Sequence, residues 1–304
     1  MATLKGQNIR ILIMDGNDAF RVVGKSTNCT VTLTGNADDV SSKDDVGLAS
    51  KPEITSKSWS VSVESLDVTD TAAVLNAIKN LTPFTLIWDE TSTADNQTME
   101  VANYNRMGQA YMNDVTFQWD DRTNSTKQLQ FAGTGPLRKY SGAPTMDIVD
   151  NDGAYTKGQF VRLFLGNDNT AAPSKILAFC KSLSLHVSLS LESNTTKDTT
   201  DDWDVQEPTA ISYDISSNAL VRGGDVITST VQGQEFASIE EIYEASNPVR
   251  FQIANVSGVN NRTKGAIICS GSVVITQLEL NSPNRQSASY TTTLTGYGIY
   301  QVAA

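Results

Sequence analysis

The sequence has little of the chemistry on which disulfide-rich domains, metal sites and active sites depend. It contains three cysteines and one histidine in 304 residues. Cys29, Cys180 and Cys269 are widely spaced and form no CxxC pair, and His186 has no second histidine as a partner. A disulfide framework or a zinc site is therefore not expected. Because no set of nucleophile, base and orienting group can be assembled, we also expect no cofactor and no enzymatic activity.

Long apolar runs are absent too. The run from Ile9 to Met14 is interrupted by Arg10 and followed by Asp15, so it is too short and too charged for the core of a signal peptide. No other segment approaches the roughly 20 apolar residues of a membrane span. We expect a protein made in a reducing cytoplasm that has no membrane partner.

Basic residues are outnumbered, with 23 Lys and Arg against 34 Asp and Glu, which gives a formal net charge of −11. This charge disfavours binding to nucleic acid or to an anionic membrane. It is compatible with a conduit that must not hold its cargo, because a negative wall repels phosphates.

What the sequence does contain favours β-structure in two domains. Ser, Thr, Val and Asn are abundant and long Leu, Glu and Lys tracts are scarce. A chain of 304 residues is long enough for two hydrophobic cores of ordinary size.

The same order of features occurs twice along the chain. Each half has a short apolar strand, an alternating strand that starts near a cysteine, a long polar loop, a second strand, a helix, a strand after a proline, and a hairpin with an Asn-rich turn. The matching pairs are Gln7–Ile13 and Gln159–Leu165, Cys29 and Cys180, the loops Gly35–Lys57 and Glu192–Thr209, Trp59–Val63 and Ile211–Ile215, Phe84–Trp88 and Val249–Ile253, and the turns Asp120–Ser125 and Asn281–Gln286. We expect a first domain over residues 1–140, a linker over 141–157 and a second domain over 158–304.

Each half contains one predicted helix, which ends shortly before Pro83 or Pro248. The first helix is expected to bury Val74, Leu75, Ile78 and Leu81. The second is expected to start with Ser238 as its cap and to bury Ile239, Ile242 and Tyr243.

Each half also ends in a Gly-x-Gly sequence, Gly133-Thr134-Gly135 and Gly296-Tyr297-Gly298. No helix follows either of them, so a strand end or a β-bulge is expected rather than a phosphate-binding loop.

Four segments of the first half resemble the tail tube proteins of long-tailed bacteriophages, contractile injection systems and gene transfer agents. They are Lys5–Ile13, Asp38–Asp44, Ser58–Glu64 and Phe131–Leu137. The resemblance implies a mainly β fold, with two tandem β-sandwich or half-barrel domains and one flanking α-helix in each. In that family six domains form a ring around a lumen, and a long loop reaches the next ring.

For this chain the resemblance implies a structural virion protein of the tail, made in the bacterial host. Three copies would supply six domains, giving a trimeric, pseudo-hexameric ring that stacks into a conduit for DNA. The expected partners are other copies of the chain, other tail proteins, and viral DNA that passes without sequence-specific binding. Polar Ser and Thr faces with acidic residues would line the channel. The expected ring-stacking residues lie in the two polar loops: Asp38, Asp39, Ser42, Lys43, Asp44, Thr196, Lys197, Asp198, Asp201 and Asp202.

An alternative is a pair of β-sandwiches that bind a glycan or a protein through loops such as Gly35–Lys57. This function requires aromatic side chains at loop tips. Trp59, Trp88 and Trp119 fall within predicted strands, and only Trp203 lies in a long loop.

Overall fold

The computed structural model describes residues 9–14, 20–23, 26–44, 50–66, 71–90, 106–139, 146–147, 156–170, 172–196, 199, 201–221, 233–234, 236–256 and 264–302. These residues form a mainly β protein with two α-helices, α1 (Thr71–Lys79) and α2 (Phe236–Ala245). The predicted fold class, mainly β with one helix in each half, is confirmed.

The strands belong to one large sheet that is antiparallel except for two short parallel pairs. The strands of the first half are β1 (Ile9–Met14), β2 (Phe20–Val22), β3 (Ser26–Asp39), β4 (Pro52–Leu66), β5 (Phe84–Glu90), β6 (Arg106–Asp120), β7 (Thr126–Lys139) and β8 (Met146–Asp147). Those of the second half are β9 (Val161–Leu165), β10 (Lys175–Leu177), β11 (Cys180–Ser193), β12 (Gln206–Leu220), β13 (Gly233–Gln234), β14 (Val249–Val256), β15 (Lys264–Asn281) and β16 (Ser289–Val302), preceded by a 3-10 turn over Gly158–Phe160.

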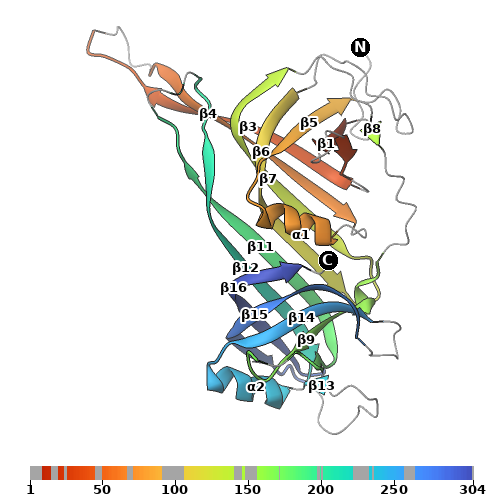
Figure 1. Ribbon diagram of the computed structural model, residues 1–304. Helices are drawn as coiled ribbons and strands as arrows, with labels where there is room; N and C mark the ends of the chain where they lie inside the picture. Colours follow the sequence, from red (N-terminus) through yellow and green to blue (C-terminus); the bar gives the residue numbers. More distant parts are fainter. Residues whose placement is uncertain are drawn as a thin grey trace.

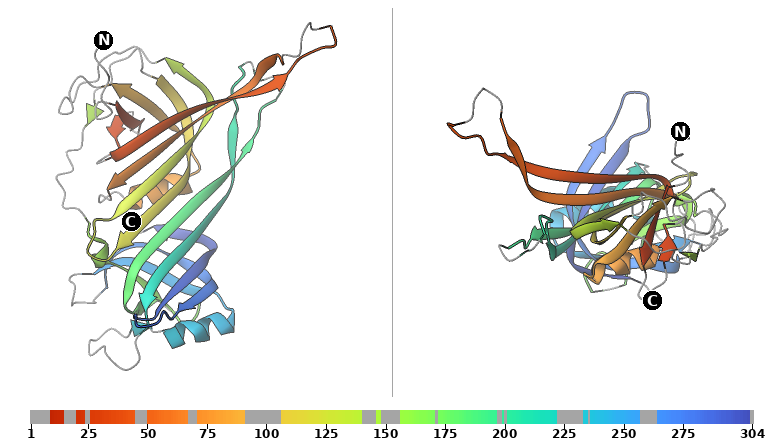
Figure 2. Two further views of the ribbon diagram at one scale, coloured as in Figure 1. Left: turned by 180° about the vertical axis from the view of Figure 1, so that it is seen from behind. Right: turned by 90° about the horizontal axis from the view of Figure 1, so that it is seen from above.

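The two halves have the same strand order. Neighbouring strands run β1-β5-β6-β7-β4-β3 in the first half and β9-β14-β15-β16-β12-β11 in the second. The halves are joined because β11 pairs with the end of β6 (Figure 1). The hairpins β3–β4 and β11–β12 extend beyond the body as two long arms (Figure 2).

The main core is an apolar cluster that runs through both halves, and a smaller cluster of Phe164, Ile176, Ala254 and Val256 lies in the second half. Alternate residues of the long strands supply it, as in Leu183, Leu185, Val187 and Leu189 of β11, because successive side chains of a strand point to opposite faces. Helix α1 packs against β6 of its own half and against β15 and β16 of the other. There the buried Tyr300 hydroxyl donates a 2.7 Å hydrogen bond to the Leu75 carbonyl.

The expected division into two domains with a linker over 141–157 stays a prediction. Of that linker, the described part comprises β8 and the residues from Thr156 onward. The shared sheet and the shared core show that the two halves pack closely, wherever the boundary is drawn.

Both segments that were expected to be long loops contain strand at their two ends. β3 continues to Asp39 and β4 starts at Pro52, while β11 continues to Ser193 and β12 starts at Gln206. The loop assignments Gly35–Lys57 and Glu192–Thr209 are therefore wrong at their ends, at residues 35–39 and 52–57 in the first segment and 192–193 and 206–209 in the second. Most side chains in the outer parts of these strands are exposed on both faces, so the sequence lacks the apolar–polar alternation that marks a strand.

The helices differ from the prediction at their ends. Val74, Leu75 and Ile78 are buried as expected, but Leu81 is exposed and lies beyond α1 with a φ of 55°. Helix α2 begins at Phe236, so Ser238 lies inside it and does not cap it, and Tyr243 is exposed. The reason for the early start is packing, because the Phe236 ring meets the Tyr290 ring at 5.4 Å between centroids.

The two Gly-x-Gly sequences lie inside β7 and β16 at irregularities of the strand pairing, so the bulge assignment is confirmed and the strand-end assignment is wrong. Gly135 and Gly298 have φ values of 72° and 78°, a region that favours glycine. At Gly133 the requirement is space: an added Cβ would lie 2.2 Å from the Trp59 indole, whose Nε1 donates to the Gly135 carbonyl at 3.1 Å.

We expect Gly133→Ala to destabilise the chain by about 1–3 kcal/mol, because the methyl group overlaps the buried indole. Urea unfolding of the unassembled chain would measure this. Gln130→Ala, an exposed position on the same strand, is the control and should change the free energy of unfolding by no more than about 0.5 kcal/mol. Equal stability of the two variants would contradict the packing described for Trp59.

Candidate functional site

Eight long strands form a continuous antiparallel sheet in the order β15-β16-β12-β11-β6-β7-β4-β3. Each half contributes four of them. One face of this sheet carries the core residues described above. The opposite face is here called the polar face.

The polar face consists mainly of uncharged polar side chains with a few acids, and it also includes Leu66, Tyr111, Ala132, Leu220 and Val274. Its polar members include Asn28, Thr30, Thr32, Thr34, Ser58, Ser60, Ser62, Glu64, Asp114, Thr116, Gln118, Asp120, Thr126, Gln128, Gln130, Ser182, Ser184, His186, Ser188, Ser212, Asp214, Ser216, Asn218, Gln277, Glu279, Asn281, Thr291, Thr293 and Thr295. None of these described positions is Lys or Arg. The face therefore offers a hydrophilic surface that attracts no phosphate through a fixed cation.

The charged cluster on this face is centred on His186. Its Nε2 lies 2.7 Å from Asp114 Oδ2 and its Nδ1 lies 3.2 Å from Asp214 Oδ2. The three residues come from the adjacent strands β11, β6 and β12. Burial by itself lowers the pKa of His186, but the hydrogen bonds and charges of the two carboxylates outweigh it, so the pKa is raised above the ordinary 6.5.

This cluster has the geometry of an ionic cross-link rather than that of a catalytic triad. Both ring nitrogens contact carboxylates, which leaves neither free to accept a proton from a serine hydroxyl. From the sequence alone, His186 had no second histidine as a partner, and its two carboxylate partners were not identified. Asp114 and Asp214 become neighbours of His186 only through the strand register.

The seam between the halves is the ladder of β6 and β11. Its register pairs Trp119 with Leu183, Phe117 with Leu185 and Val115 with Val187. All six side chains are buried on the core face. On the polar face the same ladder places Thr116 opposite His186 and Asp114 opposite Ser188.

The eight-stranded sheet has two outer edges. Within the described residues, β3 pairs with β4 alone, and the end of β15 from Val274 onward pairs with β16 alone. Large apolar side chains lie exposed on the core face at both edges: Leu33 is 60% and Leu280 is 52% exposed. An unpaired edge with apolar side chains is a site at which another chain can add a strand.

The expected ring-stacking residues of the first half lie at the exposed end of the first arm. Asp38 and Asp39 end β3, and Ser42, Lys43 and Asp44 follow it. The Asp39 carboxylate accepts hydrogen bonds from the Ser41 hydroxyl, from the Ser41 N–H at 3.0 Å and from the Lys51 N–H at 3.1 Å, and these bonds lower its pKa. The Ser42 hydroxyl accepts from the Asp44 N–H at 3.3 Å. These contacts fix the turn, while a role in stacking stays a prediction.

In the second arm the corresponding residues contact the first half of the same chain. Asp202 pairs with Lys57 at 3.2 Å and Asp201 with Arg138 at 3.9 Å. Backbone bonds reinforce this contact, since the Lys57 N–H donates to the Asp202 carbonyl at 2.7 Å. The Thr196 carbonyl accepts from the Thr199 N–H within a turn, and Lys197 and Asp198 lie outside the described residues.

Trp203, which could have served a binding loop, is only half-exposed and packs against the core cluster.

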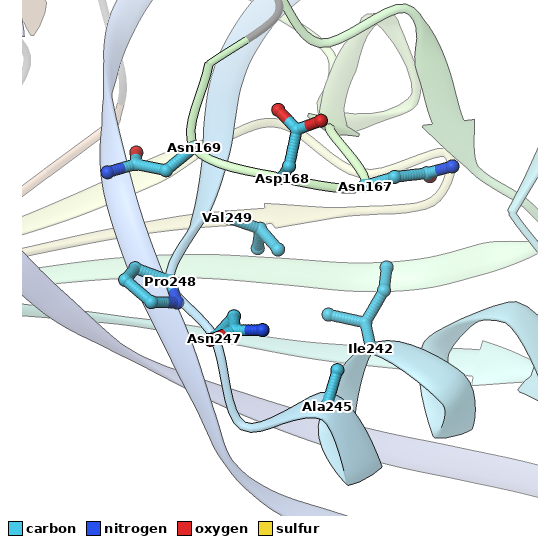
Figure 3. A pocket seen from close by; sticks show the side chains of 8 residues that line it. All are labelled: Asn167, Asp168, Asn169, Ile242, Ala245, Asn247, Pro248 and Val249. Atoms are coloured by element: carbon cyan, nitrogen blue, oxygen red, sulfur yellow. The ribbon is translucent and has the colours of Figure 1, made fainter.

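A hollow of about 290 Å³ lies elsewhere, between the end of α2 and the loop after β9 (Figure 3). Its lining residues are Asn167, Asp168, Asn169, Ile242, Ala245, Asn247, Pro248 and Val249. The Asp168 carboxylate accepts hydrogen bonds from the Thr170 N–H and hydroxyl, and these two hydrogen bonds stabilise the turn after β9.

In the part of the chain that the structure describes, no group of three His, Cys, Asp or Glu residues is placed to hold a metal ion. Neither described helix has the length and apolar character needed to cross a membrane.

Comparison with known proteins gives structural neighbours only. No protein-family model matches the sequence, and no curated protein sequence matches it. The tail of an empty gene transfer agent particle, solved with C6 symmetry, aligns with 50% of this chain and 100% of its own at 15% identity and a TM-score of 0.37. The virion of a native gene transfer agent aligns with 49% of this chain and 99% of its own at 14% identity and a TM-score of 0.35. The SPP1 tail tube aligns with 48% of this chain and 81% of its own at 11% identity and a TM-score of 0.35.

We expect His186→Gln to remove a pH-dependent part of the stability. Because the folded-state pKa of His186 is raised above 6.5, protonated His186 stabilises the fold fully below about pH 6.5, and this contribution is lost as the pH rises through the folded-state pKa. The contribution is at most about 1 kcal/mol, because the imidazole is 36% exposed.

Calorimetry of both proteins between about pH 6 and pH 9 would measure this effect. The melting temperature of the unsubstituted chain should fall relative to that of His186→Gln as the pH rises. A difference between the two proteins that stays constant with pH would contradict the role given to the two carboxylates.

Proposed function

We propose that this chain is the subunit of a phage-type tail tube, in which three copies close a ring and rings stack into a conduit for DNA. The observation that carries the proposal is the seam: β11 of one half extends the sheet of the other half at β6. If the halves are equivalent, the same joint repeated between chains generates a closed barrel whose wall has no free edge.

Irregular features at matching places support the equivalence of the halves. Both β6–β7 and β15–β16 have two register shifts, at Met107/Gln109 and Met112/Asp114 in the first hairpin and at Ser270/Ser272 and Ile275/Gln277 in the second. Six of the seven described residues with positive φ also match in pairs, namely Leu81 with Ser246, Arg122 with Arg285 and Gly135 with Gly298, while Phe179 has no counterpart among the described residues. Gly133 makes room for Trp59 as Gly296 makes room for Tyr213. We therefore propose a tandem duplication of one domain.

The polar face suits the wall of a DNA channel. Its Ser, Thr, Asn and Gln side chains keep the wall hydrated, and its carboxylates repel phosphates. The buried residues of both helices, such as Leu75 and Ile239, belong to the core cluster, so both helices would lie outside the barrel. The protein would then be made in the host cytoplasm and become part of the virion tail, with the polar arms in contact with neighbouring rings and other tail proteins.

Electron microscopy and native mass spectrometry of the purified chain test the proposal. We expect hollow tubes or rings with a near-sixfold end view and a ring mass of three times the 32.8 kDa of one chain. A chain that remains monomeric under all assembly conditions, or a ring of six chains, would contradict it.

The orientation of the sheet can be tested with an electron-dense label. In a background in which Cys29 is replaced by serine, a gold cluster attached at Ser62→Cys on the polar face should appear on the tube axis. The same cluster at Glu240→Cys on α2 should appear at the outer rim, since Glu240 is exposed on the helix. Gold at the rim for Ser62→Cys would show that the polar face points outward.

A further inference from the structure

We infer that the ring closes by antiparallel pairing of β3 with β15 of the next copy, in the register that β11 and β6 already use within the chain. This inference rests on the proposed ring and specifies its contact. The partner is a second copy of this chain, and the interaction surface consists of Asn28–Thr34 on one edge and Gln277–Asn281 on the other.

The correspondence of β3 with β11 is fixed by two bulges. The β3–β4 ladder shifts register at Ser26/Asn28 and at Asn36/Ala37, and the β11–β12 ladder shifts at Cys180/Ser182 and at Ser190/Leu191. Ser26 therefore matches Cys180 and Asn36 matches Ser190. By the same comparison, Val31 matches Leu185 and Leu33 matches Val187.

The correspondence of β6 with β15 is fixed in the same way. The shift at Met112/Asp114 matches the shift at Ile275/Gln277. Asp114 therefore matches Gln277, Val115 matches Leu278 and Phe117 matches Leu280.

If β3 of one copy pairs with β15 of the next in the register of β11 with β6, each residue of the contact has a defined partner. The pairs between copies are Thr30 with Asn281, Val31 with Leu280, Thr32 with Glu279, Leu33 with Leu278 and Thr34 with Gln277. Thr30, Thr32 and Thr34 then continue the polar face across the joint.

The burial of the apolar edge residues supports this register. Leu33 and Leu280 are 60% and 52% exposed, whereas their counterparts Val187 and Phe117 are both fully buried in the seam. Pairing between copies in the inferred register would place Val31, Leu33, Leu278 and Leu280 on the core face, as in the seam. The exposed apolar side chains at the two edges are therefore accounted for by one contact.

The arms provide a second contact of the same kind. Within the chain, the Gly135 N–H donates to the Asp204 carbonyl at 2.8 Å, and Thr134 exchanges hydrogen bonds with Gln206. The matching residues are Gly298 and Tyr297 on β16, and Ser50 and Pro52 on the first arm. Of the three hydrogen bonds, only the one from the glycine N–H to the arm carbonyl can recur between copies, because Pro52 has no N–H and Tyr297 has no hydroxyl at the position of Thr134 Oγ1. Tyr297 and Ile299 are 57% and 55% exposed, so β16 of the next copy offers an apolar surface where that arm would dock.

The two joints differ in charge. The counterparts of His186, Asp114 and Asp214 at the joint between copies are Thr32, Gln277 and Ser60, which cannot form an ion pair. The joint within the chain is therefore cross-linked by charge, and the joint between copies depends on backbone pairing and apolar contact.

Cysteine pairs test the register. In a Cys29→Ser background, Thr32→Cys with Glu279→Cys places two thiols directly opposite each other on the accessible polar face. The matched control, Thr32→Cys with Gln277→Cys, places them on a diagonal, where the two residues are about 7–8 Å apart and a disulfide does not form without movement of the backbone. All substituted side chains are exposed in the single chain, apart from the half-buried Cys29.

Both variants are assembled under reducing conditions, checked for rings by electron microscopy, oxidised and separated on a non-reducing gel. We expect covalent dimers and trimers for the first variant, with a yield about tenfold above that of the control. Three outcomes with intact rings would overturn the register while leaving the proposed function in place. They are equal cross-linking of the two variants, more cross-linking in the control, and no cross-linking in either variant. Absence of rings, including from the unsubstituted chain, would overturn both.

Discussion

A β-strand at the edge of a sheet presents unpaired backbone amides and carbonyls, and the structure of this chain depends on how such edges are paired. The end of β6 extends past β5, and β11 fills the vacant side. That ladder joins the halves, buries Trp119, Phe117 and Val115 against β11, and brings Asp114 to His186. The remaining edges, on β3 and β15, carry the same pattern without a partner among the described residues, which is why assembly is the function that the geometry favours.

The two faces of the eight-stranded sheet carry different kinds of side chain. On the core face, Trp59 lies over Gly133 and Tyr213 lies over Gly296, each on the neighbouring strand. The polar face carries the His186 cluster and hydrogen bonds between neighbouring strands, such as that between the Ser188 and Ser212 hydroxyls at 2.7 Å. In the proposed tube this face would meet DNA. A face rich in hydroxyls and carboxylates, without cations among its described positions, lets a polyanion pass without binding it.

The sequence predicted the parts of the fold that are coded locally. Alternation located β11 and β12, the residues before Pro83 and Pro248 located the helices, and the Asn-rich turns located both closing hairpins. It failed where the local signal is ambiguous: the arms are exposed on both faces, so their strands were assigned as loops. It also matched Cys29 with Cys180, whereas the bulges match Cys180 with Ser26, because strand register depends on partners distant in the chain.

The sequence by itself determined the class of the protein: a β-rich, acidic chain with a repeated order of elements and no assembled set of catalytic residues. Only the tertiary structure decided which residues form the polar face, that His186 lies between Asp114 and Asp214, and that β3 and β15 are the free edges of the described sheet. The physical reason is that alternation and turn propensity act over a few residues, whereas pairing between strands is set by the packing of segments far apart in sequence.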